Sequence, residues 1–394
     1  SMLVMSIYSL SDMFFVSRLG TSASAAVGIV FPILTMVQAV GSMLGIGGGS
    51  IISRNLGAGE SSKADLVASV TFFSSIFFGL CLMILGILYK TELMKFLGAT
   101  QTILPFAEDF AHYILIAAPI MCTAFVLNNL LRAQGKPKLS MIGLSIGGVV
   151  NIVLDPILIF GFKMGITGAA VATLIGQCVS LLILLVMYLS NKNLSKIRFS
   201  FFVSNLKILS SICITGSPSL LRQGLVVIAN VLLNIHASKY GDSAVAGISI
   251  TNRIFVLAIS VMFGLGQGFQ SVAGFSYGAK KFKRLKDAFS FTLAISVFIQ
   301  VILGFLLYRF DNQIVSLFQK DVDVIKVGTQ AIRFFTFSLP LLPIAILTNM
   351  LYQVTGQNKQ SLFLASCRQG IFFLPLIFTL PYFFGLTGLE LCQP

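Results

Sequence analysis

The sequence predicts an all-α integral membrane protein built from two bundles of transmembrane helices. Three observations predict this fold class: an apolar composition, a series of long apolar runs, and an internal repeat. The chain has 394 residues, of which 56% are hydrophobic and only 10% are charged. Its mean hydropathy is +0.94. A soluble domain of this length does not need so much apolar surface, so the composition indicates a polytopic membrane protein.

The apolar runs are long enough to cross a bilayer, which takes about 20 residues of α-helix. Reading these runs between charged loops gives about eleven spans. We expect them at residues 1–17, 25–52, 66–89, 108–131, 139–161, 165–189, 208–238, 243–271, 287–309, 328–352 and 360–383. Because the chain starts directly inside an apolar run, we expect span 1 to be trimmed.

Positive charge distinguishes the two ends of these spans. The loops that follow even-numbered spans hold most of the Lys and Arg residues, as in the basic stretch from Lys280 to Lys286. The other loops hold fewer basic residues and most of the acids. The positive-inside rule therefore places the loops after even-numbered spans in the cytoplasm. The formal net charge of +14 follows from this topology and predicts no nucleic-acid partner.

The two halves of the chain align at an offset of about 220 residues. The matched residues are Gly57 with Gly278, Asn129 with Asn349, Gly135 with Gly356, Lys138 with Lys359, and 165–168 with 385–388. Six spans in each half would make the repeats parallel, as in carriers whose halves are related by an axis along the membrane normal. We predict a first lobe at 1–190 with spans 1–6, a cytoplasmic linker at 191–207, and a second lobe at 208–394 with spans 7–11. Span 12 is then absent.

Two polar residues, Asn151 and Asp155, interrupt the apolar run 139–161 and lie on one face of the predicted helix. A carboxylate at the centre of a membrane helix costs roughly 2.5–3.5 kcal/mol on insertion scales, so it is a functional candidate by default. Asp12, Asp155 and Thr173 lie at similar depths, about 8–12 Å from the predicted outer ends of their helices. Tyr8 lies one turn from Asp12. Three helices thus bring oxygen atoms to one level.

Carboxylate, amide and hydroxyl oxygens are the ligands that a hard cation prefers. The same groups can equally hold a proton, because two nearby carboxylates in a low dielectric titrate as a coupled pair. The residues therefore leave H⁺ and Na⁺ open. Structural roles also stay open: a helix kink at Asp155 and Pro156, an Arg partner for Asp12, local bonding by Thr173 and packing by Tyr8.

Four other polar residues in predicted spans are candidates for lining a substrate pathway: Gln177, Arg222, Gln223 and Asn230. For Gln177, purely structural hydrogen bonding is an open alternative. Arg253 and Arg368 belong to the pathway, snorkel to the interface or pair with groups at a helix end. Spans 208–238 and 328–352 contain no Asp or Glu. We therefore expect ion coupling in the first lobe.

Other kinds of chemistry find little support. The six cysteines form no CxxC pair and mostly sit in apolar runs, and the two histidines are isolated. The GGGS stretch at 47–50 is not followed by GK[ST], so it is no phosphate loop. We expect no catalytic residue, no cofactor, and no metal other than Na⁺ at the coupling site. A membrane-embedded enzyme remains the alternative from a different class, although neither HExxH nor a Ser/His/Asp set occurs.

Five motifs, taken together in order and spacing, resemble the multidrug and toxin extrusion (MATE) family, in particular its DinF-type prokaryotic branch. They are YSLSDMFFVSRLG (8–20), IISRNLGAGE (51–60), LRAQGKPKLSM (131–141), NIVLDPILIFGFKMGITGAA (151–170) and GFSYGAKKF (274–282). The resemblance implies a twelve-helix, two-lobe exporter of drugs and other organic, often cationic, compounds, driven by inward flow of H⁺ or Na⁺. It assigns Asp12, Asn151 and Asp155 to the coupling site, with Thr173 and Tyr8 as neighbours.

The same resemblance implies a multi-pass monomer in a prokaryotic inner membrane, with small organic substrates and membrane lipid as its partners. The expected mechanism is alternating access, with a substrate cleft between the two lobes. A lipid-linked oligosaccharide flippase of related architecture is the alternative within transport. Such a flippase must hold a pyrophosphate and would favour a cleft rich in Arg and Lys, whereas the intramembrane acids favour cation coupling.

Overall fold

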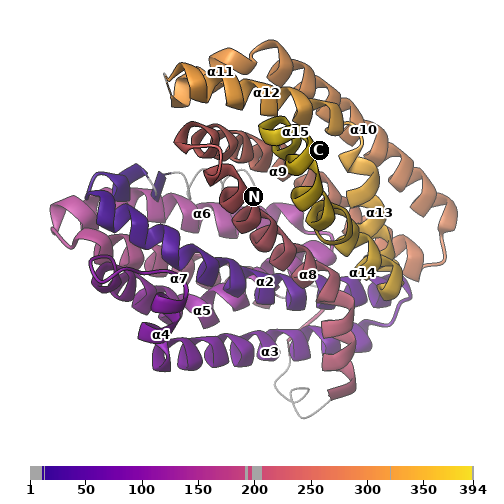
Figure 1. Cartoon of the computed structure of the whole chain (residues 1–394). Helices are drawn as coiled ribbons and strands as arrows, with labels where there is room; N and C mark the ends of the chain where they lie inside the picture. The colour runs from indigo at the N-terminus through magenta and orange to yellow at the C-terminus, as the bar shows by residue number, and fades with distance from the viewer. Residues whose placement is uncertain (1–10, 13, 191–193, 198–205, 320, 393–394) are drawn as a thin grey trace. The chain divides into compact units, whose positions relative to one another are not determined.

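The computed structural model describes residues 11–12, 14–190, 194–197, 206–319 and 321–392. Every regular element in these ranges is a helix (Figure 1). The chain divides into two compact units. The first contains Ser1–Leu220 and Gly274–Lys280, and the second contains Leu221–Ala273 and Lys281–Pro394.

The predicted spans from 25–52 onward are all confirmed as helices. Within the described residues, nine helices are long and apolar enough to cross a membrane, or up to ten if one bent pair is counted as a single span. The predicted span at 1–17 falls largely outside the described residues, of which 11, 12 and 14–17 are helical. The chain is therefore an all-α, multi-pass membrane protein.

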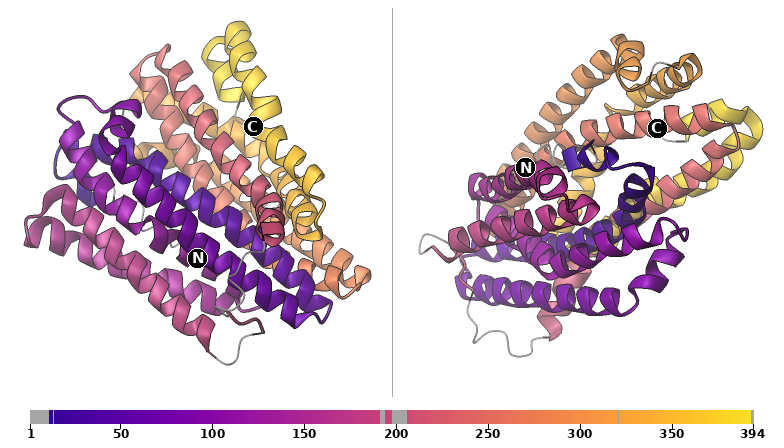
Figure 2. Two further views of the ribbon diagram at one scale, coloured as in Figure 1. Left: turned by 90° about the horizontal axis from the view of Figure 1, so that it is seen from below. Right: turned by 90° about the vertical axis from the view of Figure 1, so that its left-hand side faces the viewer.

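In the first unit, helix α5 is the central element. The helices are α2 (Thr21–Gly57), α3 (Ser61–Leu88), the short α4 (Lys90–Phe96), α5 (Leu104–Ala133), α6 (Pro137–Pro156), the π-helix η1 (Ile157–Gly161) and α7 (Gly165–Leu189). Helix α5 packs against α2, α3, α6 and α7, and most of it is buried. The indigo-to-magenta helices run side by side in both views of Figure 2.

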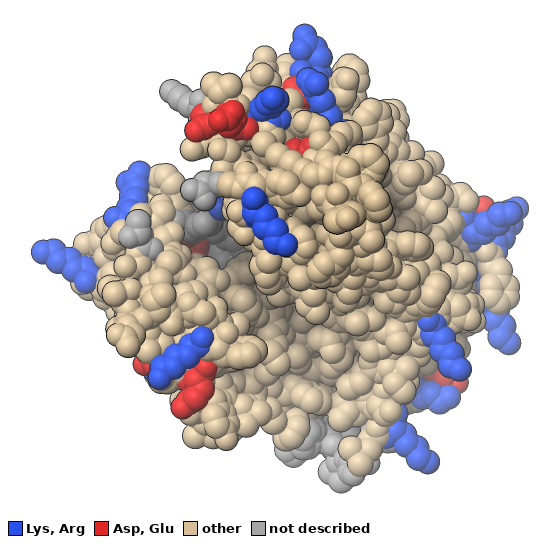
Figure 3. Space-filling view, in the orientation of Figure 1, with Lys and Arg blue, Asp and Glu red and all other residues tan. Residues whose placement is uncertain are grey.

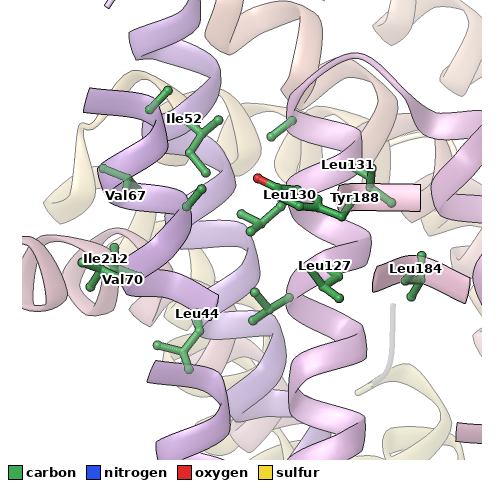
Figure 4. Close-up of a cluster of buried hydrophobic side chains, with 14 of the residues drawn as sticks. Leu44, Ile52, Val67, Val70, Leu127, Leu130, Leu131, Leu184, Tyr188 and Ile212 are labelled. Carbon is green, nitrogen blue, oxygen red and sulfur yellow. The ribbon is translucent and has the colours of Figure 1, made fainter. Parts of the chain in front are cut away.

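Aliphatic side chains fill the space between these helices. One cluster joins Leu44 of α2, Val67 of α3, Leu127 of α5 and Leu184 of α7, all of which are nearly inaccessible to solvent (Figure 4). The buried side chains recur about every three or four residues along each helix, as expected for helices that bury one face. The cluster fixes the positions of α5 and α7, and α7 in turn packs against α6.

The described start of the linker is attached to the first unit. The side-chain oxygen of Gln134 accepts hydrogen bonds from the backbone nitrogens of Leu194 (3.0 Å) and Ser195 (3.4 Å). The Asp65 carboxylate accepts a bond of 2.7 Å from the backbone nitrogen of Lys196. The Tyr188 hydroxyl lies 2.8 Å from the Ser195 hydroxyl. The chain is thus tied to the ends of α3, α5 and α7 where it leaves the first half.

Two segments from the second half of the sequence pack with the first unit through glycines. A Cβ atom added to Gly47 of α2 would lie 2.9 Å from the Gly216 nitrogen, and one added to Gly57 would lie 2.8 Å from the Phe275 carbonyl carbon. Only glycine permits backbones to approach this closely. The first unit therefore includes residues up to Leu220 and the segment Gly274–Lys280, which the sequence analysis assigned to the second lobe.

The second unit contains most of α8 and α9 and all of the helices that follow. Its elements are α8 (Leu206–Ser238), α9 (Asp242–Gly278), α10 (Phe282–Arg309), α11 (Asp311–Phe318), α12 (Val322–Ser338), α13 (Leu342–Thr355), α14 (Asn358–Ser366), the π-helix η3 (Cys367–Phe372) and α15 (Phe373–Leu391). The predicted span 328–352 is broken, because α12 and α13 meet at an angle of 54°. Helix α15 bends at Gly385, where φ is 57°.

Backbone conformations repeat at the offset found in the sequence. Positive φ angles occur at Gly20 and Gly241, at Gly59 and Lys280, at Gly135 and Gly356, and at Gly165 and Gly385. A side-chain bond repeats as well: the Asn128 amide donates to the Ser140 carbonyl (2.9 Å), and the Asn349 amide donates to the Ser361 carbonyl (2.6 Å). The structural equivalent of Asn349 is therefore Asn128, and the alignment with Asn129 was wrong by one residue.

The exterior of both units is apolar. Many large hydrophobic side chains are exposed, including Phe77, Leu88, Val186, Phe298 and Phe305. The face shown in Figure 3 has few Lys, Arg, Asp or Glu residues over most of its area. Exposed apolar side chains on long helices are typical of a surface that contacts lipid.

Candidate functional site

The site in the first unit depends on a close contact between α6 and α7. A Cβ atom added to Gly176 of α7 would lie 2.8 Å from the Gly147 carbonyl oxygen and 3.0 Å from the Asn151 Cβ. The two glycines let the helix backbones touch. Asn151 lies one turn after Gly147, and Thr173 lies one turn before Gly176, so the contact brings the amide of Asn151 against the hydroxyl of Thr173.

Asn151 connects the polar groups of these two helices. Its amide nitrogen donates to Asp155 Oδ1 and to Thr173 Oγ1, each at 3.4 Å. Asn151, Asp155 and Thr173 are 2%, 0% and 4% exposed. Both hydrogen bonds are long, because donor–acceptor distances of about 2.9–3.0 Å are usual. The amide thus orients the carboxylate of Asp155 without neutralising it.

The helix ends in an unusual way directly after these residues. Pro156 has no backbone N–H and cannot make the regular helical hydrogen bond at this point. The chain continues as the π-helix η1. The start of α7 packs against η1, since a Cβ atom on Gly168 would lie 2.8 Å from the Leu158 carbonyl carbon. π-Helical turns are frequent at functional sites, and this one follows the buried carboxylate of Asp155.

Asp12 completes the site from the first helical segment. Its carboxylate lies close enough to that of Asp155 for the two negative charges to interact. Asp12 Oδ1, Asn151 Oδ1 and Asp155 Oδ2 are buried, and none of the three accepts a hydrogen bond from the described part of the chain. Three buried acceptor oxygens of these residues therefore lack a donor, and such acceptors can take a proton or a hard cation.

The structure brings together Asp12, Asn151, Asp155 and Thr173, which we call the coupling site. Tyr8 lies outside the described residues. Gln177 follows Thr173 by one turn and is partly buried. The role of these residues in ion coupling stays a prediction.

The other pathway candidates belong to the second unit. In α8, Arg222, Gln223 and Asn230 are partly buried. The Asn230 side-chain oxygen accepts a bond of 3.1 Å from the Asn252 amide. Arg222 donates to the Asn349 side-chain oxygen at 3.4 Å. The structure therefore gives Arg222 and Asn230 polar neighbours within the second unit.

Several polar and aromatic groups of the second unit were not predicted from the sequence. Glu390 is 4% exposed, and neither of its carboxylate oxygens has a hydrogen-bond partner among the described residues. Phe255 and Phe263 lie beneath the guanidinium groups of Arg368 and Arg222. An acid within the apolar run after Gly385 was a visible signal for Glu390. The aromatic contacts left no signal, because many Phe residues of the chain occur in similar runs.

Among the described residues, no group of three or more His, Cys, Asp or Glu side chains is arranged to hold a metal ion. The coupling site differs from such a cluster, since it combines two carboxylates with an amide and a hydroxyl. This set suits an alkali cation or a proton better than a transition metal, which favours imidazole or thiolate ligands.

Comparison with known proteins gives consistent matches over nearly the whole chain. The MatE family matches residues 1–157 and 218–379. Multidrug export protein MepA of Staphylococcus aureus (strain MSSA476) is 29% identical over 383 residues, which cover 97% of this chain and 84% of that protein. MepA of Staphylococcus saprophyticus is 28% identical, covering 97% of this chain and 85% of that protein.

Two solved structures superpose closely. The outward-facing conformation of a multidrug resistance MATE family transporter of the MOP superfamily gives a TM-score of 0.94 at 29% identity, covering 100% of this chain and 88% of that one. A MOP superfamily transporter from Pyrococcus furiosus, described as having a binding pocket of reverse polarity, gives a TM-score of 0.93 at 28% identity with the same coverage.

Proposed function

We propose that this protein, which belongs to the MatE family, exports drug-like organic molecules against an inward flow of H⁺ or Na⁺. The similarity of this chain to multidrug export proteins supports drugs as the class of molecule that it transports. A transporter also fits the site, which holds buried acceptor oxygens and no paired nucleophile and base within its described residues.

The observation that carries the ion coupling is the set of buried oxygens on Asp12, Asn151 and Asp155 that accept no hydrogen bond. Burying a charged or polar group without a partner is costly, so these atoms are expected to gain a partner during the cycle. A proton shared by the carboxylates, or a Na⁺ bound by all three oxygens, would supply it. The coupling ion is thus a transported substrate of the protein.

We infer alternating access as the mechanism. An ion shifts a conformational equilibrium only if it binds the two states with different affinities. Occupancy of the coupling site would stabilise a state with lower affinity for the exported molecule. Typical coupling energies of about 1–3 kcal/mol correspond to changes in affinity of about 5–150-fold. By the positive-inside rule, the ends of the helices rich in Lys and Arg face the cytoplasm of a prokaryotic cell.

Transport in reconstituted vesicles tests this function. The full-length protein would be placed in lipid vesicles loaded with fluorescein or with the cationic xanthene dye rhodamine 123. Proton and sodium gradients would be imposed separately. We expect one gradient to drive dye efflux and the opposite gradient to reverse it. Equal dye movement with and without either gradient would overturn ion coupling, and no movement of either dye would leave export by this chain unsupported.

A further inference from the structure

Two arginines lie deep within the second unit, on neighbouring segments. Arg222 is in α8 and Arg368 is in η3. These segments touch where a Cβ atom on Gly370 would lie 3.3 Å from Leu225 Cδ1. Leu225 follows Arg222 by three residues, so the two lie on one face of α8. Arg222 and Arg368 thus lie on two segments that touch one another, and we call them the arginine pair.

Each guanidinium group has only weak partners. Arg222 lies 5.0 Å over the ring of Phe263, and Arg368 lies 5.0 Å over the ring of Phe255. A ring face attracts a cation but does not use the N–H groups in the guanidinium plane. Apart from the 3.4 Å bond to Asn349, Arg222 has no polar partner among the described residues, and neither arginine pairs with a carboxylate there.

Snorkelling does not account for these positions. Arg222 stands at the midpoint of α8 (Leu206–Ser238), which is about 24 Å from either end at 1.5 Å per residue. An arginine side chain is far too short to reach either interface from there. Arg368 lies in the π-helix η3, within the apolar segment Asn358–Leu391. A charge retained at such a depth is a functional candidate, and so is a π-helical turn.

Both arginines are surrounded by protein and yet remain partly accessible. Their charge is opposite to that of the coupling site in the first unit. A guanidinium group presents a flat fork of donors that matches a carboxylate, sulfonate or phosphate. The rings of Phe255 and Phe263 offer apolar contact beside that fork. Such surroundings suit a molecule with an apolar body and an anionic group.

We propose that Arg222 and Arg368 are two separate binding points for anionic groups of the transported molecule, so that the substrates include amphiphilic organic anions. The proposal rests on the exporter function and narrows its substrate class. Phe255 and Phe263 are eight residues apart on α9, about 12 Å along the helix axis. The two arginines therefore contribute separately, and the loss of both has a larger effect than the loss of either one.

Equilibrium binding of two dyes of similar size tests the charge preference. Fluorescein is anionic and rhodamine 123 is cationic, and both have a xanthene ring. Their fluorescence anisotropy would be titrated with full-length protein in phosphatidylcholine nanodiscs. We expect R222Q and R368Q each to weaken fluorescein binding about tenfold or more, as for the loss of a charge-assisted hydrogen bond. Rhodamine binding should not weaken. R222K keeps the charge without the fork and should give a smaller loss.

A competition on the unaltered protein avoids variants that fail to fold. Octanesulfonate should displace fluorescein, whereas octyltrimethylammonium should not. R284Q is the matched control, because Arg284 is an exposed arginine of the same unit, and it should bind fluorescein as the wild type does. Fluorescein binding that is unchanged in the R222Q/R368Q variant, or displaced equally by both octyl compounds, would overturn the proposal.

The anionic group can belong to a soluble molecule or to a lipid headgroup. Adding phosphatidylglycerol to the nanodiscs distinguishes these sources. Competition with fluorescein in the wild type would identify a lipid headgroup, and unchanged binding would identify a soluble anion. D155N should keep fluorescein binding even as it loses gradient-driven transport. Failure of the coupling function and failure of anion binding would therefore be seen in different measurements.

Discussion

Asp155 is a fully buried carboxylate with one oxygen bonded to Asn151 and the other without a partner. Replacing it with asparagine preserves its size and allows the new amide to donate to nearby oxygens. The substitution removes the negative charge and the titrating group. We therefore expect a small effect on folding and a complete loss of ion coupling.

We predict that D155N in full-length protein still binds dye but shows no gradient-driven efflux in vesicles. D12N should behave in the same way, because Asp12 supplies the other carboxylate. H112Q is the control: His112 stacks edge-on against Tyr113 in α5 and contributes no group to the coupling site, so its loss should leave efflux unchanged. Normal efflux by D155N would place ion coupling elsewhere in the molecule.

A second residue-scale prediction concerns the ion pair of α11 and α12. Arg333 Nε lies 2.6 Å from Asp311 Oδ2; the arginine side chain is 54% exposed and the aspartate side chain 6%. R333Q leaves the buried carboxylate without its charged partner. We expect a loss of stability of about 1–2 kcal/mol, reduced from the value for a buried pair because Arg333 is solvated. Thermal unfolding in detergent would measure it.

The matched control for this ion pair is R309Q. Arg309 precedes Asp311 by two residues and lies over the ring of Phe310 at 5.7 Å. It makes no ion pair with a described carboxylate. The R309Q substitution should shift the unfolding midpoint much less than R333Q does. Equal shifts would show that the Asp311–Arg333 pair contributes no specific stability.

Individual site residues could be predicted from the sequence where a polar side chain interrupts an apolar run. Asp12, Asn151 and Asp155 were identifiable because an acid or amide in an apolar run is costly. Their neighbour Thr173 was identifiable only through depth and resemblance. Glu390 was missed, because the predicted spans ended before it. Contacts such as Arg222 over Phe263 depend on helix packing, which one sequence does not specify.

At the scale of helices, the contact of α6 with α7 positions the coupling site. Gly147 and Gly176 permit that contact, and any side chain at either position meets the facing backbone. Overpacking of this kind usually costs 1–3 kcal/mol. We predict that G176V lowers the unfolding temperature and also impairs gradient-driven efflux, because it separates Asn151 from Thr173. Vesicle efflux and thermal unfolding would be measured on the same preparations.

G161A is a suitable control for G176V, since a Cβ atom on Gly161 would meet nothing within 4 Å. It should leave both stability and efflux close to wild type. Wild-type efflux by G176V would mean that the spacing of α6 and α7 does not position the coupling site.

Helix existence was predictable, whereas breaks within helices were not. Long apolar runs between charged loops predicted every span from 25–52 onward, although the predicted ends at 271 and 383 fall short of the helix ends at Gly278 and Leu391. The break between Ser338 and Leu342 was not predicted as such, although Pro340 and Pro343 mark it. A proline in an apolar run permits a kink without fixing its angle. The π-helical turns η1 and η3 also lack a sequence signature.

For the molecule as a whole, the internal repeat relates the positive-φ turns of the two halves. One contact, however, joins a segment from the second half of the sequence to the first unit. The end of α9 packs against the end of α2, where a Cβ atom on Gly278 would lie 2.8 Å from the Arg54 carbonyl carbon. The segment Gly274–Lys280 thereby joins the first unit. Relative movement of the lobes in an alternating-access cycle would have to change this contact.

We predict that G278V disturbs transport more than dye binding. A valine at this position displaces the end of α9 from α2 and biases the conformational equilibrium of the cycle. The control is G264A, because a Cβ atom on Gly264 meets nothing within 4 Å. Efflux rate and dye affinity would be compared for both variants. Wild-type efflux by G278V would show that this contact is not part of the cycle.

Binding of the coupling ion by Asp12, Asn151 and Asp155 is tested by measuring ion binding directly. Radioactive Na⁺ binding and proton exchange with a pH indicator would be measured on purified full-length wild type and D155N, without dye or gradient. We predict that the wild type binds Na⁺, or exchanges a proton, in a step that D155N lacks. Identical ion binding and proton exchange by the two proteins would contradict the account.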